Sequence, residues 1–538
     1  MQTTLGVVGG LAVGVALAAG ACSPNVLDGY DVGGTGGHGA GTSGAGGMGG
    51  AGATGTSMST GEGATGTGGA ASCTMCGGSC VNTSTDKANC GACDVTCAGG
   101  YDCMAGVCGN VVDDVSSALA TCAVLHGGEV WCWGRDVWGE IGIAPMDPGN
   151  TKCIKGDSCR VTPTKVEGLP ANDPAVEVQV NGTAACARML SGSVYCWGSN
   201  KIGLLGHAPA ADGALCTEAT AAPSSPGACS AVPQKVLMPE QAMQLALGAT
   251  NACVLSVTKK VYCWGSNASG AIADPPSPTF VYLPTYNANG DGADQVALGF
   301  ANAKGTQDTV CVRRSGSGEV DCWGASMNGT LFPATTNAAC SSGDPACSAT
   351  AIAVPMIFAM PSGPHLEATA LAVGNIISVA LMKNGTVFTW GNNNYGQMGV
   401  STPGMKFDPQ QLMGVPAVTA ISTQVVTTLL LDGSGAVWTL GWSDEGQLGT
   451  GVFDAGTCPI NNGQKCAFQP VKIAGLKDVV KIRGGGNTAE AITKDGKLWM
   501  WGSNYDASLG HVPGAGDGTC LDGPAACSAT PVLVKIPP

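Results

Sequence analysis

The sequence predicts an all-β fold built from copies of one unit, and two observations support this prediction. The first is repetition. The heptapeptide VYCWGSN occurs at residues 194–200 and again at 261–267, and related heptapeptides begin at residues 130, 320, 387, 437 and 498. Such self-similarity is typical of a repeat architecture. The second is composition, because 85 Gly, 30 Pro and only 12% charged residues favour many short strands with tight turns over long surface helices.

The first element is an apolar run, LGVVGGLAVGVALAAGAC, which ends in small residues before Cys22. Its shortness and lack of flanking charge predict a signal peptide over residues 1–21 rather than a membrane-spanning helix. The small residues before Cys22 resemble the lipobox of bacterial lipoproteins, which implies cleavage before Cys22 and a lipid on its sulfur. Secretion without a lipid and a wrongly assigned start codon are the alternatives.

Residues 22–72 are predicted to form a flexible linker. From Gly33 to Ser72 the chain is almost wholly Gly, Ala, Thr and Ser, with no apolar period that a core could bury. This linker would separate the lipidated Cys22 from the segments that fold.

Residues 73–108 are predicted to form a small disulfide-held module. Eight Cys occur in these 36 residues, and large apolar side chains are too few for a hydrophobic core. The Cys-x-x-Cys pairs Cys73/Cys76 and Cys90/Cys93 are also compatible with zinc, but export favours disulfides. The run GGSCVNTSTDKANCGACDVTC resembles the Cys-rich module of the stigma-specific protein family, which implies a spacer or adhesive unit. The pairing of the eight Cys cannot be deduced from their spacing.

Residues 109–538 contain the seven repeats. Asn384-Gly385 and Asp495-Gly496 are two-residue hairpin signals, each followed by a Trp-Gly strand and a Gly-rich loop. The pattern W-G-x-N-x-x-G-x-L-G resembles the repeat of the regulator of chromosome condensation family, which implies a seven-bladed β-propeller. In such a fold each Trp is expected to pack between neighbouring blades, and the following Gly to permit a tight turn.

The ring is expected to close through its C-terminal strand. The last segment, TPVLVKIPP, matches TPTKVEGL and QPVKIAGL, which we interpret as segments that begin a unit. No Trp-Gly strand follows the last one. We therefore expect Pro531 to Ile536 to pair into the blade that holds Cys122 and Cys132.

Cysteines within the repeats predict disulfides inside single repeats. In the early repeats two Cys stand at matching positions, and in the later repeats both are absent together, as a cross-strand bond within a hairpin requires. Buried free thiols are the alternative. The expected hairpin pairs are Cys122–Cys132, Cys186–Cys196, Cys253–Cys263 and Cys311–Cys322. The expected loop pairs are Cys153–Cys159, Cys216–Cys229, Cys340–Cys347, Cys458–Cys466 and Cys520–Cys527. With the module's eight Cys these account for 26 of 27, which leaves Cys22 for the lipid.

Charge and motifs limit the functions that the chain can have. A net charge of −14 and the lack of an evident Lys/Arg cluster argue against nucleic acid. His is scarce, and no phosphate loop, serine elbow or HExxH motif occurs. We therefore predict no catalytic residue, no metal and no cofactor.

The resulting hypothesis is a monomeric, non-catalytic binding propeller. It would be exported, either to the outer membrane or cell surface through the lipid anchor or into the medium, and would recognise a protein or a polysaccharide through its loops. The alternative is a polysaccharide-acting enzyme, a lyase or glycosidase, which requires carboxylates that converge at the propeller axis. Fold alone does not separate these two.

The candidate binding residues are amides in the turns that follow the first strand of successive repeats. Equivalent turns of a propeller collect on one face, where uncharged amides would form hydrogen bonds that are insensitive to salt. The alternative is turn chemistry, because Asn tolerates tight backbone angles. The residues are Asn181, Asn251, Asn302, Asn375, Gln424 and Asn487.

Overall fold

A computed structural model describes the chain from residue 74 to residue 537 with gaps. The described residues are 74–83, 86–96, 102–104, 107–145, 147–154, 156–208, 229–273, 276–277, 280–300, 308–325, 329–331, 347–354, 367–423, 425–451, 456–458, 464–515, 517–518, 520 and 526–537. The expected signal peptide, Cys22 and the expected linker lie outside them. In these residues we find no helix with the length and apolar character that a bilayer crossing requires.

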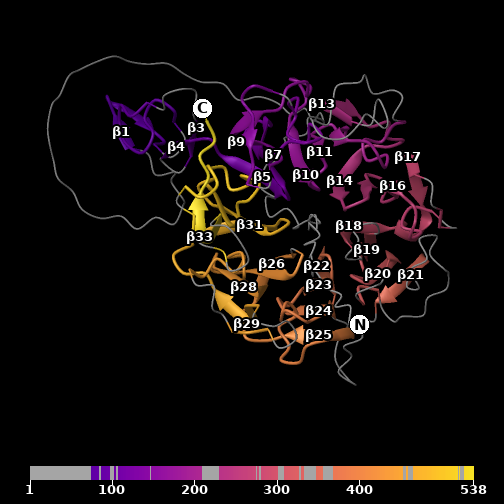
Figure 1. Cartoon of the computed structure of the whole chain (residues 1–538). Coiled ribbons are helices and arrows are strands. Elements are labelled where there is room, and N and C mark those ends of the chain that lie inside the picture. The colour runs from indigo at the N-terminus through magenta and orange to yellow at the C-terminus, as the bar shows by residue number, and fades with distance from the viewer. Residues whose placement is uncertain are drawn as a thin grey trace, which may run out of the picture.

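Seven antiparallel sheets follow one another along the chain and form a ring, so the fold is a seven-bladed β-propeller (Figure 1). Each blade has four strands bonded in sequence order, and the first blade adds a short edge strand, β8 (Thr151–Lys152). The first strands of successive blades contact one another around the axis, so the first strand is innermost. The prediction of an all-β propeller with seven blades is confirmed.

The strands of blades one to four share this order. They are β5 (Val112–Ser117), β6 (Ala120–Leu125), β7 (Val130–Arg135) and β9 (Ser158–Lys165); β10 (Ala175–Val180), β11 (Ala184–Met189), β12 (Val194–Ser199) and β13 (Cys229–Lys235); β14 (Ala242–Leu247), β15 (Asn251–Ser256), β16 (Val261–Ser266) and β17 (Phe280–Asn287); and β18 (Ala293–Phe300), β19 (Asp308–Arg314), β20 (Val320–Ala325) and β21 (Cys347–Val354). The short 3₁₀ helix η3 (Ala288–Gly290) links the third blade to the fourth.

Blades five to seven repeat the arrangement. Their strands are β22 (Ala368–Val373), β23 (Ile377–Met382), β24 (Val387–Asn392) and β25 (Met405–Leu412); β26 (Val418–Thr423), β27 (Thr427–Asp432), β28 (Val437–Trp442) and β29 (Cys466–Lys472); and β30 (Val479–Gly484), β31 (Thr488–Thr493), β32 (Leu498–Ser503) and β33 (Cys527–Leu533).

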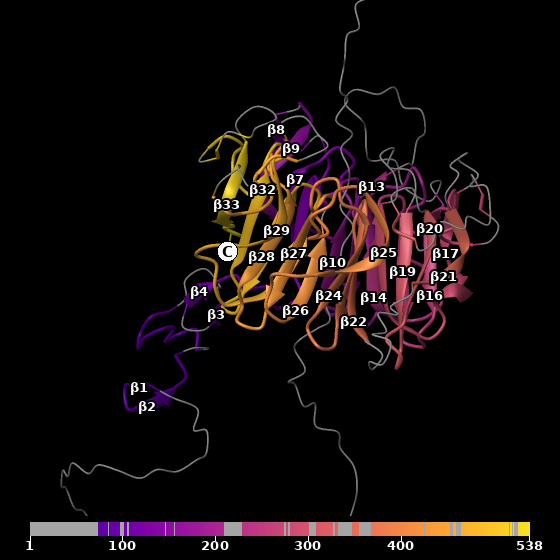
Figure 2. The same cartoon turned by 90° about the horizontal axis from the view of Figure 1, so that it is seen from below.

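The connections divide between the two faces of the ring, because consecutive strands are antiparallel. Turns between first and second strands, and loops between third and fourth strands, lie on one face, which we call the loop face. Hairpins between second and third strands, and the links that lead to the next blade, lie on the opposite face, which we call the hairpin face. Figure 2 shows the ring on edge, with the strands running between the two faces.

Each Trp of the Trp-Gly pairs is buried and bonds its blade to the preceding one. The indole Nε1 of Trp197 donates to the carbonyl oxygen of Glu140 at 3.0 Å. The same bond joins Trp133 to Ser508, Trp264 to Leu204, Trp323 to Ala271, Trp390 to Thr330 and Trp501 to Gln447. In blade six Leu440 replaces the Trp, and Thr428 Oγ1 donates to the carbonyl oxygen of Gln397 at 2.8 Å instead. The repeated heptapeptide therefore encodes contacts between blades.

The glycine of the pair is needed for a close approach between strands. Gly198 has φ +99°, and a Cβ there would lie 2.5 Å from the carbonyl oxygen of Thr183. A side chain at Gly198 would therefore be strained by its backbone and blocked by its neighbour.

Seven apolar clusters hold the ring together, one between each pair of adjacent blades. The cluster between blades seven and one contains Trp133, Leu509 and Ile536. The last blade therefore packs on the first in the same way that the other blades pack on one another.

The expected closure by strand exchange is wrong. The segment that contains Pro531 belongs to β33, which pairs with β32 in blade seven, where Leu533 faces Trp499. Blade one has its own fourth strand, β9, in which Lys165 faces Trp131. TPTKVEGL and its equivalents therefore end a blade rather than begin one, and the ring closes through packing, side-chain contacts and a backbone hydrogen bond from Val112 to Gly496.

Seven of the nine expected disulfides in the propeller are formed in the structure. They are Cys122–Cys132, Cys153–Cys159, Cys186–Cys196, Cys253–Cys263, Cys311–Cys322, Cys458–Cys466 and Cys520–Cys527. The hairpin pairs hold opposed strand positions with Cα atoms 4.1 Å apart. Cys229 and Cys347 are also disulfide-bonded, and their expected partners, Cys216 and Cys340, lie outside the described residues.

The Cys-rich module contains two short hairpins. They are β1 (Thr74–Cys76) with β2 (Ser79–Val81), and β3 (Asp102–Met104) with β4 (Val107–Gly109). Disulfides join Cys76 to Cys93 and Cys90 to Cys103, so three Cys of the two Cys-x-x-Cys pairs are in disulfides rather than available to zinc.

Candidate functional site

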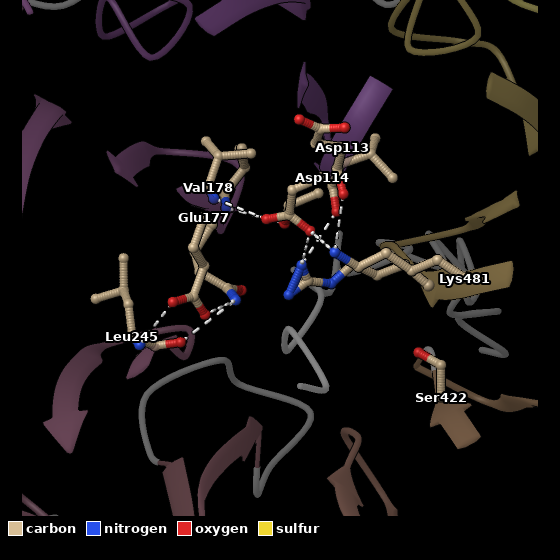
Figure 3. Close-up of polar contacts among 12 residues, drawn as sticks. Asp113, Asp114, Glu177, Val178, Leu245, Ser422 and Lys481 are labelled. Carbon is tan, nitrogen blue, oxygen red and sulfur yellow. Dashed lines mark hydrogen bonds and ion pairs between the residues drawn. The ribbon is translucent and has the colours of Figure 1, made fainter. Parts of the chain in front are cut away.

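The inner strands place carboxylates close to the propeller axis, as the enzyme hypothesis requires. Asp114 on β5 and Glu177 on β10 are both buried, and Figure 3 shows them on neighbouring blades. What these two groups contact decides whether they are available to a substrate.

Both carboxylate oxygens of Asp114 have partners inside the protein. One oxygen, Oδ1, lies 2.6 Å from Nζ of Lys481 and 3.5 Å from a guanidinium nitrogen of Arg483, both on β30 (Figure 3). The other oxygen, Oδ2, accepts a hydrogen bond from the backbone N–H of Val178 at 2.8 Å. Burial alone would raise the pKa of Asp114, but Lys481 and Arg483 hold it below its ordinary value. Asp114 therefore stays ionised and links blade seven to blade two.

Glu177 likewise accepts hydrogen bonds from a cation and from a backbone amide. Its Oε2 accepts from Nε of Arg188 at 2.7 Å and from the backbone N–H of Leu245 at 3.2 Å. Gln244 and Gln295 make comparable bonds to the backbone of the next inner strand, at Val296 and Leu371. The polar residues of the inner strands thus form a ladder between blades, and its carboxylates are neutralised by cations and amides.

Three other carboxyls are buried and have raised pKa values. Burial raises the pKa of Glu490 to about 7, of Asp136 to about 7 and of Glu140 to about 8. Glu490 Oε1 accepts from the hydroxyls of Ser117 and Thr488 in the contact between blades seven and one. Packed strands and loops enclose these carboxyl groups. Their pKa values are therefore raised only when the ring has assembled.

The four candidate amides that the structure describes lie on the loop face, and two of them form hydrogen bonds inside the protein. Asn181 is buried, donates to the carbonyl oxygen of Gly248 in the next blade at 2.8 Å, and accepts from the N–H of Ala184 at 2.9 Å. Asn251 is also buried and donates to the carbonyl oxygen of Ser266. This placement favours the turn interpretation for both.

The other four candidate amides are placed differently. Asn375 is buried, with its Oδ1 lacking a partner among the described residues, and Asn487 is partly exposed. Asn302 and Gln424 lie outside the described residues.

Sequence reasoning missed two polar features. The Asn of the Trp-Gly loops closes the loop, since Asn200 Oδ1 accepts from the N–H of Leu205 at 3.1 Å while its Nδ2 donates to the carbonyl oxygen of His207 at 3.0 Å.

The second feature is a lysine cluster, although no Lys/Arg cluster was expected. Two hollows of about 460 and 610 Å³ lie on the hairpin face between blades six and seven. Their lining includes Lys472, Lys477, Lys494 and Lys497.

Comparison with known proteins identifies the repeat. Sequence profiles described as the regulator of chromosome condensation (RCC1) repeat match residues 384–425 and 434–492, and a second profile of the same description matches 244–271 and 368–397. The chain is a propeller of RCC1 repeats. The matched RCC1 segments fall in blades three, five, six and seven.

Similar proteins cover up to 66% of the chain. The ultraviolet-B receptor of Arabidopsis thaliana is 28% identical over 66% of this chain and 69% of its own length. The human regulator of chromosome condensation is 24% identical over 63% of this chain and 74% of its own length. The human E3 ubiquitin-protein ligase HERC2 is 32% identical over 28% of this chain, but the match spans only 3% of that protein.

Solved structures show the same fold. Prp20p of Saccharomyces cerevisiae superimposes with a TM-score of 0.57 at 17% identity, over 79% of this chain and 87% of that one. Human WBSCR16 gives a TM-score of 0.55 at 20% identity, over 76% of this chain and 94% of that one. These likenesses show the propeller fold alone.

Proposed function

We propose that this chain is a non-catalytic binding propeller that is displayed outside the cytoplasm on a lipid anchor at Cys22. The proposal that the chain is non-catalytic rests on the contacts that Asp114 and Glu177 make inside the protein. Each of these two carboxylates is satisfied by a cation and a backbone amide, so neither is free to act on a glycosidic bond.

The disulfides support display in an oxidising compartment. Such bonds persist in exported proteins and are rare where thioredoxin and glutathione keep thiols reduced. Disulfides join both hairpins and loops of the propeller, and others hold the Cys-rich module. A stable ring with exposed connections on two faces suits a receptor or scaffold that recognises a protein or a polysaccharide.

The test has two parts. Fractionation and protease accessibility of the full chain, compared with a Cys22→Ser variant, report whether the protein is displayed and anchored. The immobilised full chain is then incubated with envelope extract, and any retained component must be displaced by the free chain. Retention of an unmodified component that is displaced supports a binding propeller. A cytoplasmic protein, a lack of displaceable retention, or cleavage of the retained component would contradict the proposal.

A further inference from the structure

A basic patch interrupts the hairpin face of this acidic protein. Four Lys and two Asp, Asp478 and Asp495, line the two hollows between blades six and seven, whereas the whole chain carries a net charge of −14. The hollows lie on either side of the link between these blades and share the lining residues 475–478. We call this continuous feature the lysine groove.

Two lysines elsewhere on the hairpin face are neutralised by acidic residues in the links between blades. Lys260 in the hairpin of blade three lies 3.2 Å from Glu240, and Lys383 in the hairpin of blade five lies 2.8 Å from Glu367. Lys494 occupies the position in blade seven that Lys383 occupies in blade five, since the backbone N–H of each bonds to the link that precedes its blade.

Two lysines of the groove lack this neutralisation. Lys477 and Lys494 are exposed and form no ion pair with any described residue. Lys497 is paired with Asp495 at 2.6 Å, and Lys472 lies over the ring of Trp438 at 5.8 Å. The groove therefore carries unpaired positive charge. An anion can bind it while the exposed lysines and the anion stay largely hydrated.

Aromatic surface lies beside these charges. Trp499, which is partly exposed, lines the larger hollow together with Lys494 and Lys497. Trp438 is also partly exposed and lies beneath Lys472, which lines the smaller hollow. An indole face packs well on the apolar face of a sugar ring while neighbouring ammonium groups bind its carboxylate, and pockets commonly combine aromatic walls with a few placed charges.

We propose that the lysine groove binds an anionic polysaccharide, a linear chain of carboxylated sugars that crosses the link at Gly475–Asp478. This inference rests on the proposed binding function and names its ligand and surface. Lys477 and Lys494 pair with the carboxylates, and Trp499 packs on a sugar ring. An acidic protein segment would use the lysines but would gain less from the indole surfaces.

The experiment uses the full chain and three probes: polygalacturonate, the neutral polymer dextran and polyglutamate. The test variant is Lys477→Gln with Lys494→Gln, and the matched control is Lys383→Gln. We expect polygalacturonate to bind at low salt, and binding to weaken about tenfold in the test variant because two ion pairs are lost. It should weaken further at high salt, stay unchanged in the control, and exceed binding of the other probes.

Three results would overturn the inference. They are no binding of polygalacturonate, equal binding by the test variant, and binding of polyglutamate or dextran that is as tight as that of polygalacturonate. Unchanged melting temperatures exclude misfolding, since the substituted side chains are exposed. If the test variant still retains its envelope component, the groove is the wrong surface while the proposed binding function stands.

Discussion

Asp114 Oδ1 and Lys481 Nζ lie 2.6 Å apart, and this contact joins the innermost strand of the first blade to that of the last. Asp113, the neighbouring residue, is instead exposed and lies beside His126. The ring closure of this propeller thus depends on an ion pair beside the axis, on the indole bond from Trp133 to Ser508 and on the apolar cluster between the two blades.

Removal of the Asp114 charge should destabilise the whole ring. Asp114→Asn removes the carboxylate charge that Lys481 and the buried Arg483 contact, which costs about 3–5 kcal/mol in the free energy of unfolding. Denaturant unfolding followed by Trp fluorescence measures this loss. Asp113→Asn is the matched control and should change stability little. Equal effects of the two variants would show that the pair does not hold the ring closed.

Glu490 makes stability depend on pH near neutrality. Burial raises its pKa to about 7 from the ordinary value of 4.5, so the folded protein holds a proton that the unfolded chain has released. Stability should therefore decline as pH rises from about 4.5 to about 7, by on the order of 3 kcal/mol at most, and then level off. Asp136 and Glu140 add to the same trend.

The Glu490→Gln variant should reduce that decline, and melting temperatures across this pH range measure it. Glu167→Gln, at an exposed position, should leave the profile unchanged. A decline of the same size in Glu490→Gln would mean that another group releases the proton.

Much of the fold could be predicted from sequence because the same contact recurs. Every blade needs a large residue that packs on its neighbour and a glycine that lets the third strand pass close by, so Trp-Gly returns in six blades and Leu440-Gly441 takes its place in blade six. Blade boundaries could not be read in this way. TPTKVEGL looks alike whether it ends one unit or begins the next, and only pairing partners, such as Lys165 opposite Trp131, distinguish the two.

The candidate site was harder to predict, because its parts come together only in the folded ring. Lys472, Lys477 and Lys494 belong to a strand end, a link and a hairpin, and none of them stands in a basic run. The candidate amides did not predict an exposed binding surface, because a local turn also explains them. Asn181 suits a tight turn, and the same turn places its side chain against the next blade.

In blade six, where Leu440 stands in place of the Trp, the hydroxyl of Thr428 makes the bond to the preceding blade and should contribute to stability. Thr428→Val keeps the shape of the side chain but leaves the carbonyl oxygen of Gln397 unsatisfied, which costs about 1–3 kcal/mol. Thr162→Val, at an exposed strand position, is the control. Urea unfolding compares the variants, and a Thr428→Val protein as stable as the parent would remove Thr428 from this role.

The hairpin disulfides should stabilise the propeller without defining its fold. Blade five has Val379 opposite Thr389 where blade two has Cys186 opposite Cys196. Cys186→Val with Cys196→Thr should therefore preserve the ring and cost about 3 kcal/mol by loss of the short closed loop. Calorimetry measures the cost, and the β signal in circular dichroism checks the fold. Loss of that signal would show that this disulfide is needed for folding.

The most direct test of the binding surface is the reactivity of individual lysines. The full chain is labelled with an amine-reactive reagent in the presence and absence of polygalacturonate, and labelling is quantified residue by residue by mass spectrometry. Lys477 and Lys494 should lose reactivity when the polymer is present, while Lys383, at the equivalent hairpin position, should keep it. Protection of Lys383 to the same degree, or no protection of Lys477 and Lys494, would contradict binding at the lysine groove.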